Sequence, residues 1–167
     1  MAGVRLKQHF DTLLENALAA CEAHYGDRLV SLVVFGSVGR GVPGPESDLD
    51  LLVVADDLPQ GRLGRVAEFR AVERALGPQL EEMRSAGLFP ELSPVFKTTP
   101  EVDRGSPLFL DMVQDARILY DREGFMQGRL ARLEERLNAL GARRIWRGNA
   151  WFWDLKPDYK PGEVFEL

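Results

Sequence analysis

The sequence predicts an α/β protein, of the α+β type, in which helices flank a small mixed β-sheet. Residues 29–35 (LVSLVVF) and 51–54 (LLVV) are short apolar runs rich in β-branched residues, and turn residues bound them. Such runs are typical of buried strands. Longer segments elsewhere repeat apolar residues at the spacing of one helix face. The 167 residues suffice for a domain with a real hydrophobic core.

Composition narrows the class of protein before any motif is considered. An apolar fraction of 45% with 28% charged residues is that of a globular protein in water. The net charge of −5 gives no reason to expect nucleic acid or an anionic membrane as a partner. The single cysteine fits a reducing compartment, and no signal segment or long apolar run is visible. We therefore expect a cytoplasmic protein.

The N-terminal segment, residues 5–24, predicts an amphipathic helix that packs on the sheet. Its apolar face comprises Phe10, Leu13, Leu14, Ala17, Leu18 and Cys21. Because Cys21 continues this stripe, we interpret it as a small core residue and not as a nucleophile.

Beyond the second strand, apolar spacing and turn residues predict the remaining elements. In chain order these are a helix over 63–85, a strand over 89–98, a short helix over 108–113, a strand over 115–121 and a helix over 124–140. Gly77-Pro78 predicts a kink or a break in the first of these helices. The two prolines of the strand over 89–98 favour an edge position in the sheet.

The polar stretch between the first two strands holds the candidate site. Asp48 and Asp50 are two residues apart on a strand, so their side chains point the same way. Two carboxylates on one face repel each other unless a cation lies between them, and Mg²⁺ suits carboxylates and phosphate oxygens alike. Gly36 and Ser37 let a backbone approach a phosphate, with the Ser37 hydroxyl as a donor. A phosphate-binding turn followed by a carboxylate pair is what nucleotidyl transfer requires.

Two further residues of this stretch are candidates for binding a nucleotide. Arg40 can contact a phosphate, and it can equally pair with Glu46 or face solvent. Ser47 lies in a loop rich in glycine and proline, where its hydroxyl can instead hydrogen-bond the backbone. For Ser47 the structural role is the favoured interpretation.

These motifs together resemble a known signature. The residues GS at 36–37, RG at 40–41 and SDLDL at 47–51 resemble the GS…RG…SDxDL pattern of the polymerase-β-type nucleotidyltransferase superfamily. The size of the chain resembles that of the minimal nucleotidyltransferases (MNT proteins). The resemblance implies the nucleotidyltransferase fold and a Mg²⁺-dependent enzyme. It would move a nucleoside monophosphate, most simply AMP from ATP, to an acceptor hydroxyl.

The resemblance also assigns roles to residues. Asp48 and Asp50 become metal ligands and catalytic residues. The superfamily usually draws a third carboxylate from the strand after the next helix, and Glu91 is the only acid within residues 89–98. We therefore predict that Glu91 is the third catalytic and metal-binding carboxylate, with Asp103 as the fallback.

The sequence does not identify the acceptor of the nucleoside monophosphate. The minimal nucleotidyltransferases imply an antitoxin that adenylylates a HEPN-domain toxin on a tyrosine. No HEPN-like R-x4-6-H motif is present in this chain, so such a toxin would be a separate protein. The alternatives are a non-catalytic antitoxin of the same fold and a transferase acting on a sugar or aminoglycoside. A homo-oligomer also remains open.

The C-terminal segment, residues 143–167, is set apart from the predicted nucleotidyltransferase domain over 1–142 by its aromatic residues. It contains all three tryptophans of the chain, with arginines nearby. That composition could stack on single-stranded nucleic acid, but the acidic balance of the chain argues against it. We expect the segment to dock on the domain or on a partner.

Overall fold

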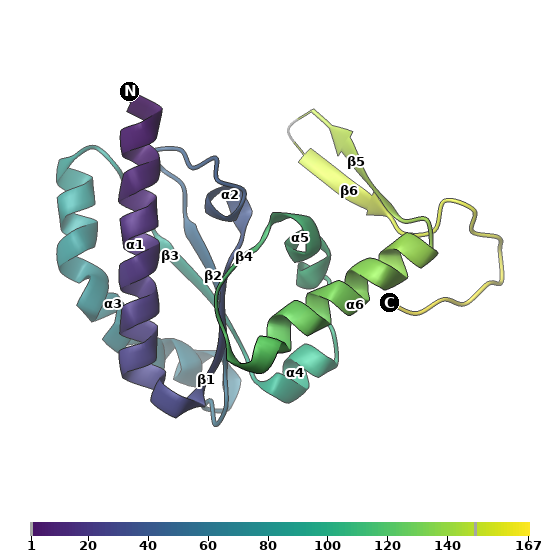
Figure 1. Cartoon of the computed structure of the whole chain (residues 1–167), viewed down its shortest axis with the longest axis horizontal. Coiled ribbons are helices and arrows are strands. Elements are labelled where there is room, and N and C mark those ends of the chain that lie inside the picture. Colours follow the sequence, from purple (N-terminus) through teal and green to yellow (C-terminus); the bar gives the residue numbers. More distant parts are fainter. Residues whose placement is uncertain (1, 149) are drawn as a thin grey trace.

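The computed structural model describes residues 2–148 and 150–167, which form six α-helices, two short 3₁₀ helices and two β-sheets (Figure 1). In chain order the elements are α1 (Ala2–Tyr25), η1 (Gly26–Arg28), β1 (Leu29–Val34), α2 (Gly36–Gly39), β2 (Leu49–Ala55), α3 (Gly61–Ser85), β3 (Leu92–Lys97), α4 (Thr99–Asp103), α5 (Leu108–Asp115), β4 (Arg117–Asp121), η2 (Arg122–Gly124), α6 (Phe125–Ala139), β5 (Arg143–Arg147) and β6 (Ala150–Asp154).

The central sheet has the strand order β3-β2-β1-β4. Strand β1 pairs antiparallel with β2 and β4, whereas β2 pairs parallel with β3, so the sheet is mixed. A parallel pair needs a crossover connection, and α3 supplies it. The mixed sheet flanked by helices confirms the predicted fold class, and β3 lies at an edge as its prolines predicted.

The helices cover the sheet in two layers. On one face α1 and α3 pack over Leu49, Leu51 and Val53 of β2. On the other face α4, α5 and α6 pack over Leu52 and Val54 (Figure 1). Each fully buried side chain of this size contributes about 1.5–3 kcal/mol. Because side chains alternate along a strand, Asp50 belongs to the same row as Leu52 and Val54, on the face of α4, α5 and α6.

Cys21 lies in the core between α1 and the sheet, as its place in the apolar stripe predicted. Its side chain is fully buried. Burial raises the pKa of the Cys21 thiol to about 12, because the thiolate would lose its hydration. Among the described residues, no helix is both long enough and apolar enough to cross a membrane.

Of the kink or break expected at Gly77-Pro78, the break is not found: helix α3 is continuous, with Pro78 inside it. The proline costs about 3 kcal/mol in a helix interior, but Leu76 and Leu80 on either side of it are buried. Their burial offsets that cost. The C-terminal segment, for which no regular structure was expected, forms an antiparallel hairpin of β5 and β6.

One ion pair joins α3 to α4. The Arg65 guanidinium donates to both Glu101 carboxylate oxygens, at 2.7 and 3.0 Å. The same carboxylate accepts from the Thr98 backbone N–H at 2.8 Å, closing a capping box at the start of α4. The hydrogen bonds from Arg65 lower the pKa of Glu101 to about 2.

The first prediction concerns stability and pH. The pKa of Glu101 is lower in the fold than the ordinary glutamate value of 4.5, so its contribution to stability is present above that value and is lost as pH falls toward 2. Glu101→Gln should lower the free energy of unfolding by about 1–3 kcal/mol near pH 7. The difference from wild type should shrink near pH 3 in urea unfolding. Glu81→Gln, an exposed helical ion-pair partner, is the control. A difference that does not depend on pH would contradict the assignment.

Candidate active site

The site begins where β1 ends, at Gly36. This residue has φ +67, and a Cβ placed there would lie 2.1 Å from Asp50 Oδ2. The Phe35 backbone N–H donates to the Asp50 carbonyl oxygen at 3.0 Å, which extends the pairing of β1 with β2 to this point. The Asp50 carboxylate therefore lies directly against the Gly36 backbone, in space that any side chain at position 36 would fill.

The two predicted carboxylates differ in environment. Asp48 is exposed, whereas Asp50 is partly buried within β2. Burial raises the pKa of Asp50, and the negative charge of Asp48 raises it further, while the Ser93 hydroxyl and the Arg40 charge act in the opposite direction. A cation bound between the two carboxylates would offset both unfavourable effects.

The third predicted carboxylate is not gathered with this pair. Glu91 is exposed and precedes β3, where its carbonyl oxygen accepts from the Leu49 N–H at 2.7 Å. The fallback, Asp103, pairs with Arg129. Across residues 2–148 and 150–167, no three Asp, Glu, His or Cys side chains group as a metal site would need. Glu91 as a metal ligand thus stays a prediction.

Ser93, which the sequence analysis did not single out, occupies the position beside Asp50. The parallel pairing of β2 and β3 places the two residues in register, so their side chains project from the same face of the sheet. The alternation of side chains within residues 89–98 shows which residues share a face with Ser93. It does not show that Ser93 pairs with Asp50, because the register between two strands cannot be derived from the sequence of one of them.

The donor set fits Mg²⁺ delivered with a nucleotide. Asp48, Asp50 and Ser93 offer only oxygen atoms, the ligands of a hard cation. Mg²⁺ commonly binds through one or two carboxylates plus the phosphates of its substrate, and seldom through a cage made of protein alone. Two carboxylates beside the glycine–serine turn are sufficient for that mode.

Ser37 and Ser47 lie together at the site. The Ser37 hydroxyl donates to Ser47 Oγ at 2.8 Å, and the Gly44 backbone N–H donates to the same oxygen at 2.8 Å. Ser47 therefore holds the loop over residues 41–48 against α2, the structural role that the sequence favoured. Ser37 remains adjacent to Gly36, where a phosphate oxygen could replace Ser47 as its partner.

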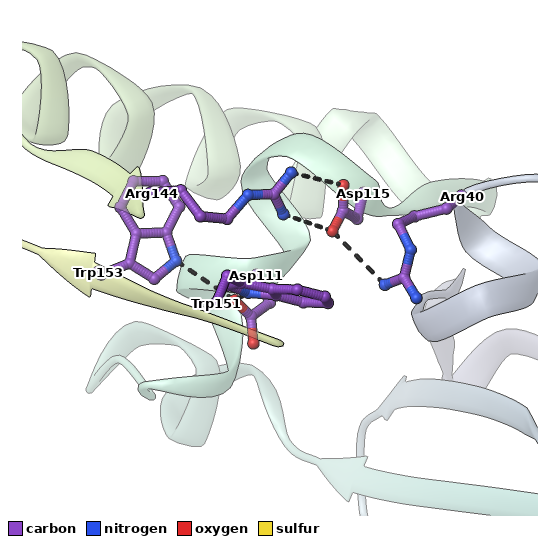
Figure 2. Close-up of polar contacts among 6 residues, drawn as sticks. All are labelled: Arg40, Asp111, Asp115, Arg144, Trp151 and Trp153. Atoms are coloured by element: carbon purple, nitrogen blue, oxygen red, sulfur yellow. Dashed lines mark hydrogen bonds and ion pairs between the residues drawn. The ribbon is translucent and has the colours of Figure 1, made fainter. Parts of the chain in front are cut away.

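Arg40 follows α2 and points toward the C-terminal hairpin. Its guanidinium Nη1 lies 3.6 Å from Asp115 Oδ2, and its Cζ lies 5.0 Å from the ring centroid of Trp151. Figure 2 shows these contacts together with Arg144, which also binds Asp115. The predicted alternative partner, Glu46, is not the one found. Asp115, Arg144 and Trp151 were not predicted as neighbours of the site, because nothing local in the sequence joins them to Arg40.

A mixed sheet that sets a glycine–serine turn against two carboxylates is the arrangement of a nucleotidyltransferase. Residues 14–101 match the family model described as "Nucleotidyltransferase domain". The chain belongs to this family and is a nucleotidyltransferase.

Relatives were found among curated proteins and solved structures. MJ1305 of Methanocaldococcus jannaschii, named as a candidate protein adenylyltransferase, is 31% identical over 126 residues, which cover 74% of this chain and 80% of that protein. A crystal structure of the toxin–antitoxin MntA-HpeT aligns at TM-score 0.41 and 18% identity, covering 76% of this chain and 91% of that one. A candidate nucleotidyltransferase from Sulfolobus solfataricus aligns at TM-score 0.41 and 19% identity, covering 74% and 90%.

The second prediction tests the contact between Gly36 and Asp50. Gly36→Ala places a methyl group 2.1 Å from Asp50 Oδ2, so the carboxylate must rotate away from the turn. Binding of ATP with Mg²⁺, measured by calorimetry, should weaken by about tenfold or more, with the fold retained.

Gly26→Ala is the matched control for this variant. Gly26 also has a positive φ, +53, but its Cβ would meet nothing within 4 Å. Both variants carry the backbone strain of a non-glycine residue at positive φ, about 1–2 kcal/mol. If both bind the nucleotide as wild type does, the contact has no part in binding.

Proposed function

We propose that this nucleotidyltransferase moves AMP from ATP, with Mg²⁺, to a hydroxyl group on another protein. The observation that carries the proposal is the close approach of the Asp50 carboxylate to Gly36. A phosphate bound by the backbone of Gly36 and Ser37 would lie beside Asp50, the carboxylate that would hold the accompanying cation.

Each residue has a part in this proposal. Gly36 and Ser37 bind phosphate oxygens, and Arg40 supplies a positive charge on the same side. Asp48 and Asp50 would hold Mg²⁺, which when bound neutralises phosphate charge and makes an acceptor hydroxyl more acidic. The acceptor oxygen bonds to the α-phosphorus as the bond to pyrophosphate breaks, and the hydroxyl proton passes to solvent.

A protein acceptor is supported by the relative MJ1305, whose name describes a protein adenylyltransferase and which aligns with most of this chain. The resemblance of the sequence to minimal nucleotidyltransferases makes a tyrosine of a separate HEPN-type toxin the first acceptor to test. Such a partner gives the enzyme an antitoxin role. A contact-only antitoxin would neutralise its toxin without ATP, and a small-molecule transferase would act on a sugar or aminoglycoside alone.

The third prediction tests the carboxylate pair. Asp48→Asn combined with Asp50→Asn removes both charges and keeps the shapes of the side chains. Metal-dependent ATP binding should weaken, and AMP transfer should fall by about a hundredfold or more. Calorimetry and transfer from α-labelled ATP measure the two effects, and circular dichroism checks the fold.

Asp57→Asn is the control for charge. Asp57 is exposed in the turn after β2, at the other end of that strand, and has φ +52, which asparagine tolerates. It should bind and transfer as wild type does. Undiminished transfer by the double variant would refute the proposed mechanism. Toxin neutralisation that needs neither ATP nor these aspartates would establish the contact-only alternative.

The fourth prediction tests the third carboxylate. If Glu91 completes the metal site, as the sequence predicts, Glu91→Gln should weaken Mg²⁺-dependent ATP binding by about tenfold. Titration of Mg²⁺ at fixed ATP measures the effect. A Glu91→Gln protein that matches wild type would leave Asp48 and Asp50 as the carboxylates of the site.

A further inference from the structure

We propose that the β5–β6 hairpin is part of the nucleotide site, where Trp151, Arg144 and Asp115 position the Arg40 guanidinium for the phosphates of ATP. This inference rests on the proposed function, because Arg40 is assigned to the phosphates there. It adds an element outside residues 14–101, the part of the chain that matches the nucleotidyltransferase domain.

One face of the hairpin carries three tryptophans and Arg144. The antiparallel pairing sets Trp146 opposite Trp151 and Arg144 opposite Trp153. Directly opposed residues project from the same face, as do residues two apart along a strand. All four side chains therefore share one face, and the Trp146 and Trp151 rings lie 4.9 Å apart.

This face docks on α5 through two aspartates. Asp111 and Asp115 are four residues apart on the helix, so they lie on the same side. The indole N–H groups of Trp151 and Trp153 donate to Asp111 Oδ1, at 2.8 and 3.2 Å. Arg144 donates to both oxygens of Asp115, at 2.6 and 3.3 Å (Figure 2).

Asp115 and Trp151 connect the hairpin to Arg40. Asp115 is only 9% exposed and lies between two guanidinium groups, close to that of Arg144 and 3.6 Å from that of Arg40. The Cζ atoms of Arg40 and Arg144 each lie 5.0 Å from the centroid of Trp151. Charge and cation–π attraction thus restrict where the Arg40 side chain can point.

The guanidinium of Arg40 is oriented by an ion pair and an aromatic ring more than by hydrogen bonds. In the described part of the chain its side chain donates no hydrogen bond, although it has an ion pair and a ring beside it. Arg65 is different, since it donates to Glu101 and to the carbonyl oxygens of Pro59 and Phe96. An arginine whose side chain is held in place, and whose N–H groups can still donate hydrogen bonds, is suited to bind phosphate oxygens.

Arg40 is also close enough to act on the site itself. It comes four residues after Gly36, and its backbone N–H donates to the Gly36 carbonyl oxygen at 3.1 Å, so the two residues are one helical turn apart. A phosphate beside Gly36 is therefore within the field of Arg40.

The experiment is a double-mutant cycle on the full-length protein, with Arg40→Ala, Trp151→Ala and the combined variant. Trp151→Ala should weaken ATP–Mg²⁺ binding by about threefold to tenfold, raising KM for ATP with kcat nearly unchanged. The same change should add little in the Arg40→Ala background, because both act through one guanidinium. Trp151→Phe keeps an aromatic ring and should recover most of the binding.

Phe152→Ala is the matched control within the hairpin. Phe152 lies on the opposite face, under Arg147, and is 44% exposed. It should bind ATP as wild type does. Arg144→Lys serves as a second test that leaves Trp151 intact: it keeps the charge, loses the two-point contact with Asp115, and should also raise KM.

The outcomes separate the two proposals. A folded Trp151→Ala protein with wild-type ATP affinity, or losses that simply add in the combined variant, would overturn the role of the hairpin and leave the proposed function standing. Wild-type protein that binds no ATP with Mg²⁺ would overturn the proposed function, and this inference with it.

Discussion

The antiparallel pairing of β1 with β2 is the constraint on which the site depends. Both strands are buried by helices on each face, and the hydrogen bond from Phe35 to Asp50 carries their pairing one residue past the end of β1. The chain must then turn at Gly36 while Asp50 lies directly beside it. Apolar burial therefore determines where the turn at Gly36 meets the Asp50 carboxylate, and a shift of one residue in register would move Asp50 to the opposite face.

Helix α5 connects this core to the C-terminal hairpin. Phe109 and Met112 pack under the sheet, while Asp111 and Asp115 accept hydrogen bonds from the hairpin. One short helix thus transmits the position of the core to Trp151 and from there to Arg40. In the proposed function, Arg40 supplies local positive charge for an anionic nucleotide in a chain whose net charge is −5.

Patterns within single segments predicted most of the fold. The apolar runs that predicted the first two strands correspond to β1 and β2, and helical spacing predicted α1, α3 and α6. Pro78 does not end α3, because the burial of its neighbours outweighs its local preference. The hairpin could have been suspected from two runs of large side chains on either side of Gly148, since glycine favours tight turns. The aromatic residues of this segment predicted docking on the domain or a partner, and strand pairing was not predicted.

The sequence by itself determined the local part of the site: a glycine at the end of one buried strand and two aspartates spaced to share a face at the start of the next. These relations depend on backbone geometry over a few residues. Only the tertiary structure decided which distant residues join them. Ser93 reaches Asp50 through strand register, and Trp151 reaches Arg40 only because α5 holds the hairpin there. The physical reason is that packing between elements depends on the whole core, which no single segment of the chain encodes.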